Sequence, residues 1–189
     1  PAGTLGMKDK TKPQYVCDFS LALVNRTGAF YVGKDLVEGL SDLFLTTRYW
    51  RFFRDTPPNY NLFWKIMGRL MLLEAHSLGS SERFRVPVPS QHPDRPTVFC
   101  DPLYVLRADL KPEDVVLCHD VGPISHSFLF DAQTSTLYHE AYEKIRNAKC
   151  GLVFVSEASR EAFQTYFGDD YRFLKAIPLF TRMQAVQGE

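Results

Sequence analysis

Two short apolar runs, separated by one helical pattern, dominate the second half of the chain. The runs are DVVLC at 114–118 and CGLVFVS at 150–156, and the apolar residues of STLYHEAYEKIRNAK at 135–149 recur at helical spacing. Strands that are apolar at consecutive positions are buried on both faces, as in parallel sheets covered by helices. The pattern predicts an α/β domain of Rossmann-like type, with a mostly parallel sheet and helices on both faces.

The rest of the chain continues this alternation. Runs of strand formers alternate with apolar residues at helical spacing, and Ser156 and Gly168 stand where a helix N-cap and C-terminal stop are expected. A Pro- and Ser-rich stretch at 79–97 predicts a loop. We expect further strands at 14–24 and 171–180, a short strand and turn at 98–106, and further helices at 33–44, 61–76 and 156–168.

Length and composition favour one globular domain. The 189 residues are 45% hydrophobic, and 22 basic residues balance 22 acidic ones, so no overall field points to nucleic acid. We expect a flexible leader at 1–13, a single domain at 14–180, and a tail or start of an interdomain linker at 181–189. The four cysteines are widely spaced and form no CxxC pair, which indicates reduced thiols in a cytosolic protein.

Polar residues follow three of the expected strands. They are NRTG at 25–28, then His119 and Asp120, and then Ser156 and Glu157. Ligands of such sheets bind at the carboxyl ends of the strands, so these residues are candidates for one site. Each group also has a purely structural interpretation: a strand–helix turn, a turn aspartate beside a half-buried histidine, and a helix N-cap.

Several kinds of site are disfavoured by their missing motifs. The first turn reads NRTGAFYVG, without the GxGxxG of a dinucleotide site, although helix amides and Arg26 could still meet a phosphate or a sugar hydroxyl. His126 lies seven positions after His119, so a zinc site is possible but only weakly indicated. No GxSxG motif supports a small α/β hydrolase.

Cationic and aromatic residues are interleaved between residues 47 and 69. Such a mixture suits the headgroup zone of an anionic membrane, and it would also suit a stacked single strand of nucleic acid, against which the zero net charge argues. The alternative is an aromatic core with a solvated basic rim. The candidates for a membrane surface are Arg48, Trp50, Arg51, Arg54, Lys65 and Arg69.

The second half of the chain resembles a known enzyme family. VVLCHDVGPISH, then YHEAYEKIRNAKCGLVFVSEASREAF, are similar to the N-terminal domain of family 4 retaining glycosyltransferases of the GT-B fold. Their shared pattern is a strand ending in His-Asp, a Pro-containing loop, a helix with tyrosines, and a strand closing on Val-Ser-Glu-x-Ser. RTGAFYVGKDLVEGL resembles a variant of the family's first loop and helix. The resemblance covers 14–44 and 114–178 and is absent over 45–100.

The resemblance implies a role for each matching residue. His119 would lie at the cleft, near the transferred sugar and the acceptor hydroxyl, and Asp120 would shape the turn. The first loop, with Arg26, Thr27 and Gly28, would lie beneath the phosphates and sugar of the donor. Ser156 and Glu157 would lie deeper along the same edge of the cleft.

The resemblance also implies which substrates and partners to expect. It is strongest to mannosyltransferases that extend lipid-linked exopolysaccharide units. We therefore expect a nucleotide-sugar donor, a lipid-linked sugar acceptor, no cofactor and no metal, and a location at the inner face of the plasma membrane. The donor-binding second domain of the family has no counterpart, because the chain stops after AIPLF. We therefore expect an isolated acceptor-side domain, inactive alone. The alternative is a non-catalytic module that binds a glycan or lipid-linked sugar.

Overall fold

The computed structural model describes residues 15–24, 26–58, 61–78 and 92–178, with the side chains of 75–78 excepted. The expected leader, Asn25, most of the Pro- and Ser-rich stretch, and the expected tail lie outside these residues. A seven-stranded sheet forms the centre, in the order β3-β2-β1-β4-β5-β6-β7. The strands are β1 (Tyr15–Asp18), β2 (Phe44–Tyr49), β3 (Phe52–Arg54), β4 (Thr97–Phe99), β5 (Val115–Cys118), β6 (Gly151–Phe154) and β7 (Phe173–Ala176).

All neighbouring strands are parallel except β2 and β3, which are antiparallel. The prediction of an α/β fold with a mostly parallel sheet is therefore confirmed. The α-helices are α1 (Gly28–Gly39), α2 (Leu62–Leu78), α3 (Gly122–Ser125), α4 (Ala132–Ala148) and α5 (Glu157–Phe167). Short 3-10 helices η1 (Ser20–Leu23), η2 (Ser41–Leu43), η4 (Pro102–Arg107) and η5 (Ser127–Leu129) join them.

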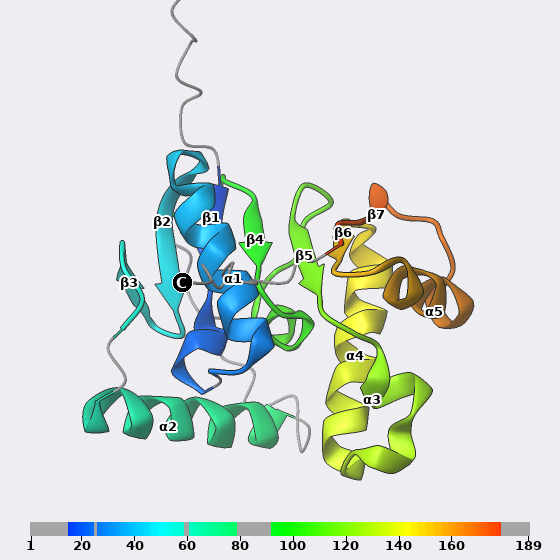
Figure 1. Ribbon diagram of the computed structural model, residues 1–189, viewed down its shortest axis with the longest axis horizontal. Coiled ribbons are helices and arrows are strands. Elements are labelled where there is room, and N and C mark those ends of the chain that lie inside the picture. The colour runs from blue at the N-terminus through cyan, green and yellow to red at the C-terminus, as the bar shows by residue number, and fades with distance from the viewer. Residues whose placement is uncertain (1–14, 25, 59–60, 79–91, 179–189) are drawn as a thin grey trace, which may run out of the picture.

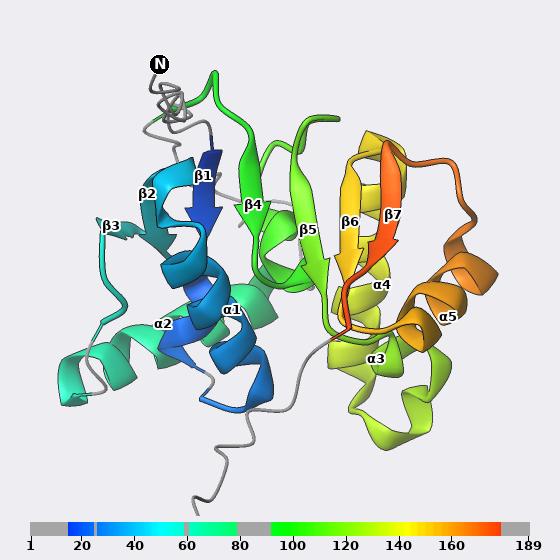
Figure 2. The same ribbon diagram turned by 45° about the horizontal axis from the view of Figure 1, so that its top comes forward.

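The direction in which the chain crosses the sheet decides which face each helix covers. From β1 the chain passes through α1 to β2 on one side, whereas from β5 it passes through α4 to β6 on the other. Right-handed crossovers in opposite directions place their helices on opposite faces. Figures 1 and 2 show this arrangement, with α1 in front of the sheet and α4 behind β6.

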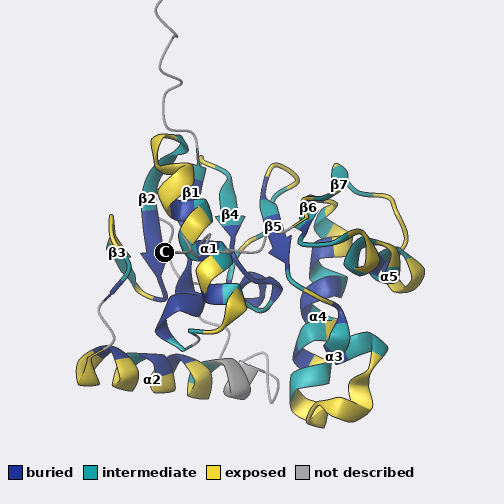
Figure 3. Ribbon diagram, in the orientation of Figure 1, coloured by how far each residue is buried: buried dark blue, intermediate teal, exposed yellow. Residues whose placement is uncertain are grey.

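The buried core joins both faces of the sheet. Strand residues such as Val116 and Leu152 are fully buried and belong to the same apolar cluster as Phe30 of α1, Ile145 of α4 and Phe163 of α5. Figure 3 shows that the central strands are largely buried, whereas the edge strands β3 and β7 and the outer sides of the helices are more exposed. All four cysteines are free and buried.

Two predicted boundaries in the first half of the chain are wrong. The strand expected at 14–24 ends at Asp18, because the Ser20 N–H and hydroxyl both donate to Asp18 Oδ1, at 3.0 and 2.5 Å, and fold the chain into η1. The helix expected at 33–44 spans 28–39 instead, and Phe44 already begins β2. The apolar residues beyond the end of this helix keep the helical spacing, so the pattern did not show where the helix ends and the strand begins.

Helix α2 has apolar residues on two faces and packs into the domain with one of them. Trp64, Gly68 and Met71 are buried, whereas the larger apolar set that includes Phe63 and Leu70 is exposed. A Cβ at position 68 would collide with the Leu23 carbonyl oxygen, so glycine lets α2 approach the backbone of η1 closely. Figure 1 shows α2 lying across the lower end of the sheet, where the parallel strands end.

Candidate functional site

The sheet has one point at which its strand order reverses. From β1 the chain moves outward to β2 and β3, whereas β4 to β7 follow on the other side of β1. In open α/β sheets a crevice forms at such a switch point, outside the carboxyl ends of the strands. Asp18 ends β1, Asp101 follows β4, and His119 follows β5, so three ionisable residues meet at this edge.

His119 is held at the edge by a hydrogen bond to the neighbouring strand end. Its Nε2 lies 3.0 Å from the carbonyl oxygen of Cys100, and because a carbonyl only accepts, Nε2 carries the proton. The ring is half-buried, and this burial lowers the pKa of His119 below its ordinary value despite the opposing effects of the Cys100 carbonyl and Asp120. The ring is therefore neutral at pH 7, with Nδ1 as its acceptor atom.

Asp120 builds the turn that follows β5. Its Oδ1 accepts a hydrogen bond from the Gly122 N–H at 2.7 Å, and its carbonyl accepts one from the Tyr142 hydroxyl at 2.8 Å. The side chain is exposed at the same time. The turn-shaping role expected for Asp120 is therefore present, and a free face of the carboxylate remains open to a ligand.

Asp101 is a site residue that sequence reasoning missed. It follows β4, is buried, and accepts a hydrogen bond from the Leu103 N–H at 2.8 Å. The Tyr138 hydroxyl lies 3.4 Å from each carboxyl oxygen. Burial raises the pKa of Asp101 to about 7, further raised by Asp120 and Asp18 and opposed by the hydrogen bonds from Leu103 and Tyr138. Its signal was the strand-end sequence VFCDP, where an aspartate precedes a proline at a helix start.

The raised pKa of Asp101 makes the stability of the domain depend on pH. Because the folded state binds the proton more tightly, this contribution is fully present below about pH 4 and is lost as the pH rises through about 7. Asp101→Asn removes the titration. We expect the free energy of unfolding of the variant, relative to wild type, to rise by on the order of 3 kcal/mol between pH 4 and pH 8. Urea unfolding across this range measures the difference.

A matched control for Asp101 is the exposed N-cap residue Asp131. Hydrogen bonds from the Thr134 hydroxyl and N–H lower the pKa of Asp131, so its contribution is lost as the pH falls rather than as it rises. That loss occurs below about pH 4, so between pH 4 and pH 8 the profile of Asp131→Asn should run parallel to that of wild type. Parallel pH profiles for Asp101→Asn and wild type would contradict the assignment of Asp101.

The first loop lies two strands away from His119, since β4 separates β1 from β5. This spacing is about 10 Å. The Arg26 guanidinium donates to the Pro58 carbonyl at 2.8 Å and stacks 4.1 Å from the centre of the Phe30 ring. Thr27 is the N-cap of α1 but makes no capping hydrogen bond with its side chain, and the space around the Gly28 Cα is open. The loop therefore presents α1 amides and one anchored cation.

Ser156 and Glu157 follow β6, beside His119. Ser156 is the N-cap of α5 and accepts a hydrogen bond from the Ser159 N–H at 3.1 Å, as its pattern predicted. The Ser159 hydroxyl donates to the His119 carbonyl at 3.3 Å, which ties the two strand ends together. Glu157 is exposed and pairs with Arg160 at 2.7 Å. Both residues thus have structural roles at the same edge.

Arg48 is not a membrane-surface residue, which corrects the prediction. Its Nε and Nη2 lie 3.0 and 2.5 Å from Asp18 Oδ2, and both side chains are buried. Burial alone would raise the pKa of Asp18, but Arg48, then Arg107, and hydrogen bonds from Ser20 and Arg48 hold it below its ordinary value. A charged pair thus lies inside the domain at the end of β1.

Trp50 is also buried, which removes a second membrane candidate. Its indole N–H donates to Glu74 Oε2, and Glu74 also accepts hydrogen bonds from Arg51 at 2.9 Å and from Arg107 at 3.1 Å. Glu74 thereby fastens α2 to the β2–β3 turn and to η4. The other membrane candidates are exposed, namely Arg51, Arg54, Lys65 and Arg69.

A groove opens between α3 and α4, lined by residues other than those of the candidate site. Its volume is about 450 Å³, and it is lined by Pro123, Ile124, Ser127, Ser135, Thr136, His139 and Glu140. Among the described residues, no group of three or more His, Cys, Asp or Glu side chains could hold a metal ion. The strand-end edge itself offers the Nδ1 acceptor of His119, the exposed carboxylate of Asp120 and the amides at the start of α1, a mixture that suits a ligand with several hydroxyl groups.

Comparison with known proteins adds no relative. The chain matches no model of a protein family, no curated protein and no solved structure. The fold class therefore stands on the sheet order and strand directions alone, and the likeness to the glycosyltransferase family stays an expectation. What the chain shares with known folds is the mostly parallel, Rossmann-like sheet with its switch point between β1 and β4.

Proposed function

We propose that this chain is the acceptor-side domain of a retaining glycosyltransferase that moves a sugar, mannose in our proposal, from a nucleotide-sugar to a lipid-linked oligosaccharide. The observation that carries the proposal is the neutral His119 at the switch-point edge, which precedes the exposed Asp120 and is hydrogen-bonded to the carbonyl of Cys100, next to the buried Asp101 in the sequence. The reaction would belong to bacterial polysaccharide synthesis, and the donor would be held by a second domain.

The chemistry of the edge supports sugar hydroxyls as ligands. A neutral imidazole can accept a proton from a hydroxyl and return it, and a carboxyl with a pKa near 7 can donate or accept a hydrogen bond. Retaining transfer of this class relies on positioning and on charge stabilisation rather than on a strong protein nucleophile. His119 would orient the acceptor hydroxyl, and Asp101 would act through the strand end that positions it.

The first loop supports a minor role in binding the donor. Arg26 is anchored on Phe30 and Pro58, and the α1 amides with the open space at Gly28 could meet a phosphate. One loop of this kind is a weak site for a diphosphate compared with a Gly-rich loop. The main donor contacts would therefore come from outside these 189 residues.

Calorimetry on the chain tests the proposal. The probes are geranyl-diphosphoglucose, as a soluble lipid-linked sugar, geranyl diphosphate without the sugar, and GDP-mannose. We expect the lipid-linked sugar to bind at least about tenfold more tightly than either of the others, since a few good hydroxyl contacts supply this difference. Tighter binding of GDP-mannose, or no gain from the sugar, would overturn the acceptor assignment.

A non-catalytic binding module is the second candidate. This candidate is favoured because three of the expected site residues make contacts within the domain, which leaves them less able to take part in catalysis. They are Ser156, Glu157 and Arg26. The two candidates differ when the chain is supplied with a donor-binding domain. Transfer that appears only in the combined protein supports the transferase, and acceptor binding without transfer in any combination supports the module. Robust transfer by the 189-residue chain alone would contradict the acceptor-side assignment.

A further inference from the structure

Exposed apolar side chains are concentrated in two segments of the molecule. Among the described residues, 13 large hydrophobic side chains are exposed, and nine of these belong to α2 or to the segment 128–130. Scattered exposed apolar residues need no explanation, but a cluster marks a surface that binds something. The nine are Leu62, Phe63, Ile66, Leu70, Leu72, Leu73, Phe128, Leu129 and Phe130.

On α2 the exposed apolar residues form a stripe along the helix. Successive residues turn by about 100° around the axis, so positions 62, 66, 70 and 73 fall on one side. The opposite side, with Trp64 and Met71, packs into the domain. An α-helix that buries one apolar face in the protein normally presents a polar outer face to water. This helix does not, although Leu62 is 73% and Leu73 is 64% exposed.

The charges bordering this stripe are basic. Lys65 and Arg69 are exposed and lie along one edge of it. Glu74 is the one acidic residue in the sequence of α2, and Trp50, Arg51 and Arg107 surround its carboxylate. An apolar helix face bordered by Lys and Arg is typical of helices that lie in the interface of an anionic bilayer.

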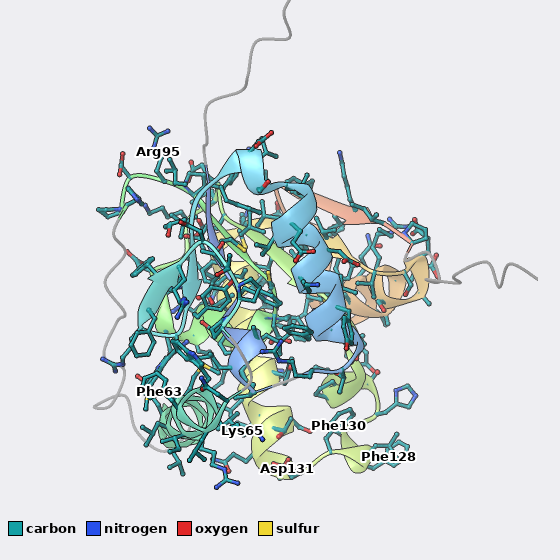
Figure 4. The ribbon with its side chains drawn as sticks, turned by 60° about the vertical axis from the view of Figure 1, so that its left-hand side comes forward. Phe63, Lys65, Arg95, Phe128, Phe130 and Asp131 are labelled. Atoms are coloured by element: carbon teal, nitrogen blue, oxygen red, sulfur yellow. The ribbon has the colours of Figure 1, made fainter. Side chains whose placement is uncertain are left out.

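The second segment projects on the same side of the molecule. Phe128 is 80% exposed and Leu129 is 69% exposed, at the tip between α3 and α4. In Figures 1 and 4, both α2 and this tip reach the lower end of the molecule, whereas Arg95 lies at the upper end of Figure 4. The nearby Asp131 accepts hydrogen bonds from Thr134 at the N-terminus of α4, and these hydrogen bonds partly offset the negative charge of its carboxylate.

From these observations we infer that α2 and residues 128–130 form one docking face for an anionic lipid bilayer, with α2 lying in the plane of the interface. A bilayer fits better than a protein partner, because the apolar surface consists of two separate projections with a basic border rather than one concave groove. No helix among the described residues is long and apolar enough to cross a bilayer. The inference rests on this surface and not on the proposed sugar transfer.

Flotation with vesicles tests the docking face. The vesicles contain equal parts of phosphatidylcholine and phosphatidylglycerol, with pure phosphatidylcholine for comparison, and the probe is the chain itself at low salt. We expect the chain to float with the anionic vesicles and far less with the neutral ones. Leu73→Glu should lower the binding constant by about tenfold or more, since it removes one apolar anchor and adds a negative charge. Tyr166→Glu is the matched control.

Tyr166 is 51% exposed and belongs to α5, which lies far from α2 in Figure 1, so its substitution should leave binding unchanged. A second pair of variants tests the charge. Lys65→Gln should weaken binding to anionic vesicles about fivefold, whereas Arg95→Gln at the opposite end should have no effect. Circular dichroism establishes that each variant is folded.

Three results would overturn the docking face. They are no flotation of the wild-type chain with anionic vesicles, equal losses for Leu73→Glu and Tyr166→Glu, and self-association that Leu73→Glu abolishes while vesicle binding is absent. The last result would identify a second copy of the chain as the occupant. Because no sugar enters the assay, failure here is separate from failure of the acceptor-binding experiment.

Discussion

Asp18→Asn should lower the free energy of unfolding by about 3–5 kcal/mol, because it leaves the buried guanidinium of Arg48 without its counter-charge. Asp18 is fully buried and the Arg48 side chain is 6% exposed, so water does not replace the lost partner. Domains of this size are stabilised by about 5–15 kcal/mol, so the loss is a large part of the total. Urea unfolding at pH 7 measures it.

A double variant shows how much of the loss in stability comes from the unpaired charge and how much from altered side-chain packing. Asp18→Asn combined with Arg48→Met removes both charges, and replacing a buried pair by apolar groups is often nearly neutral. We expect the double variant to be more stable than Asp18→Asn alone. If Asp18→Asn costs less than about 1 kcal/mol, or if the double variant is the less stable of the two, the pair does not hold the end of β1 as described.

His119→Ala should reduce sugar transfer by about 10²-fold or more when the chain works together with a donor-binding domain. Positioned acid–base groups contribute about 10²–10⁴-fold, and the neutral ring of His119 lies at the switch-point edge where the acceptor is proposed to bind. Stability should change little, because the ring is half-buried and makes one hydrogen bond to a backbone carbonyl. Initial rates at saturating donor measure the effect.

Two further variants make the His119 result specific. His119→Gln can still donate to the Cys100 carbonyl, so it should keep the local structure while losing the proton-accepting ring. His139→Ala removes an exposed histidine of α4 that packs against the ring of Phe167. We expect His119→Gln to remain impaired and His139→Ala to retain near wild-type rates. Activity of His119→Ala within a few-fold of wild type, with unchanged stability, would show that His119 serves only the fold.

The second half of the fold follows from local sequence because its elements are continuous. The runs at 114–118 and 150–156 enclose β5 and β6, and the pattern at 135–149 predicts α4 to within three residues at its start. Helix α5 begins after Ser156 and ends before Gly168, as its capping residues predicted. Here burial, propensity and capping all favour the same elements.

The first half could not be derived in the same way, because its decisive contacts join distant residues. The sequence predicts a surface position for Arg48 of β2, because its partner Asp18 lies 30 positions earlier in the chain. Helix α2 has apolar residues on two faces, so its pattern does not show which one packs inward. Asp101 was missed because its raised pKa depends on burial beneath elements that are far away in the sequence.

The site was predicted in part. The positions of His119, Asp120 and Ser156 at strand ends follow from the runs of apolar residues that precede them, and parallel strands bring such ends to one edge. The sequence did not indicate how each side chain is engaged. Arg26 is anchored on Phe30, Glu157 pairs with Arg160, and Arg48 and Trp50 lie in the interior.

Mapping of a bound acceptor by NMR tests the central claim most directly. Geranyl-diphosphoglucose is titrated into the isotope-labelled chain, and shifts of the backbone amides are followed. We expect the largest shifts at the switch-point edge, at the amides of Asp101 and Leu103 and of residues 119–122, with smaller ones at the start of α1. Shifts confined to the groove between α3 and α4, or to the opposite end of the sheet near Arg95, would contradict it.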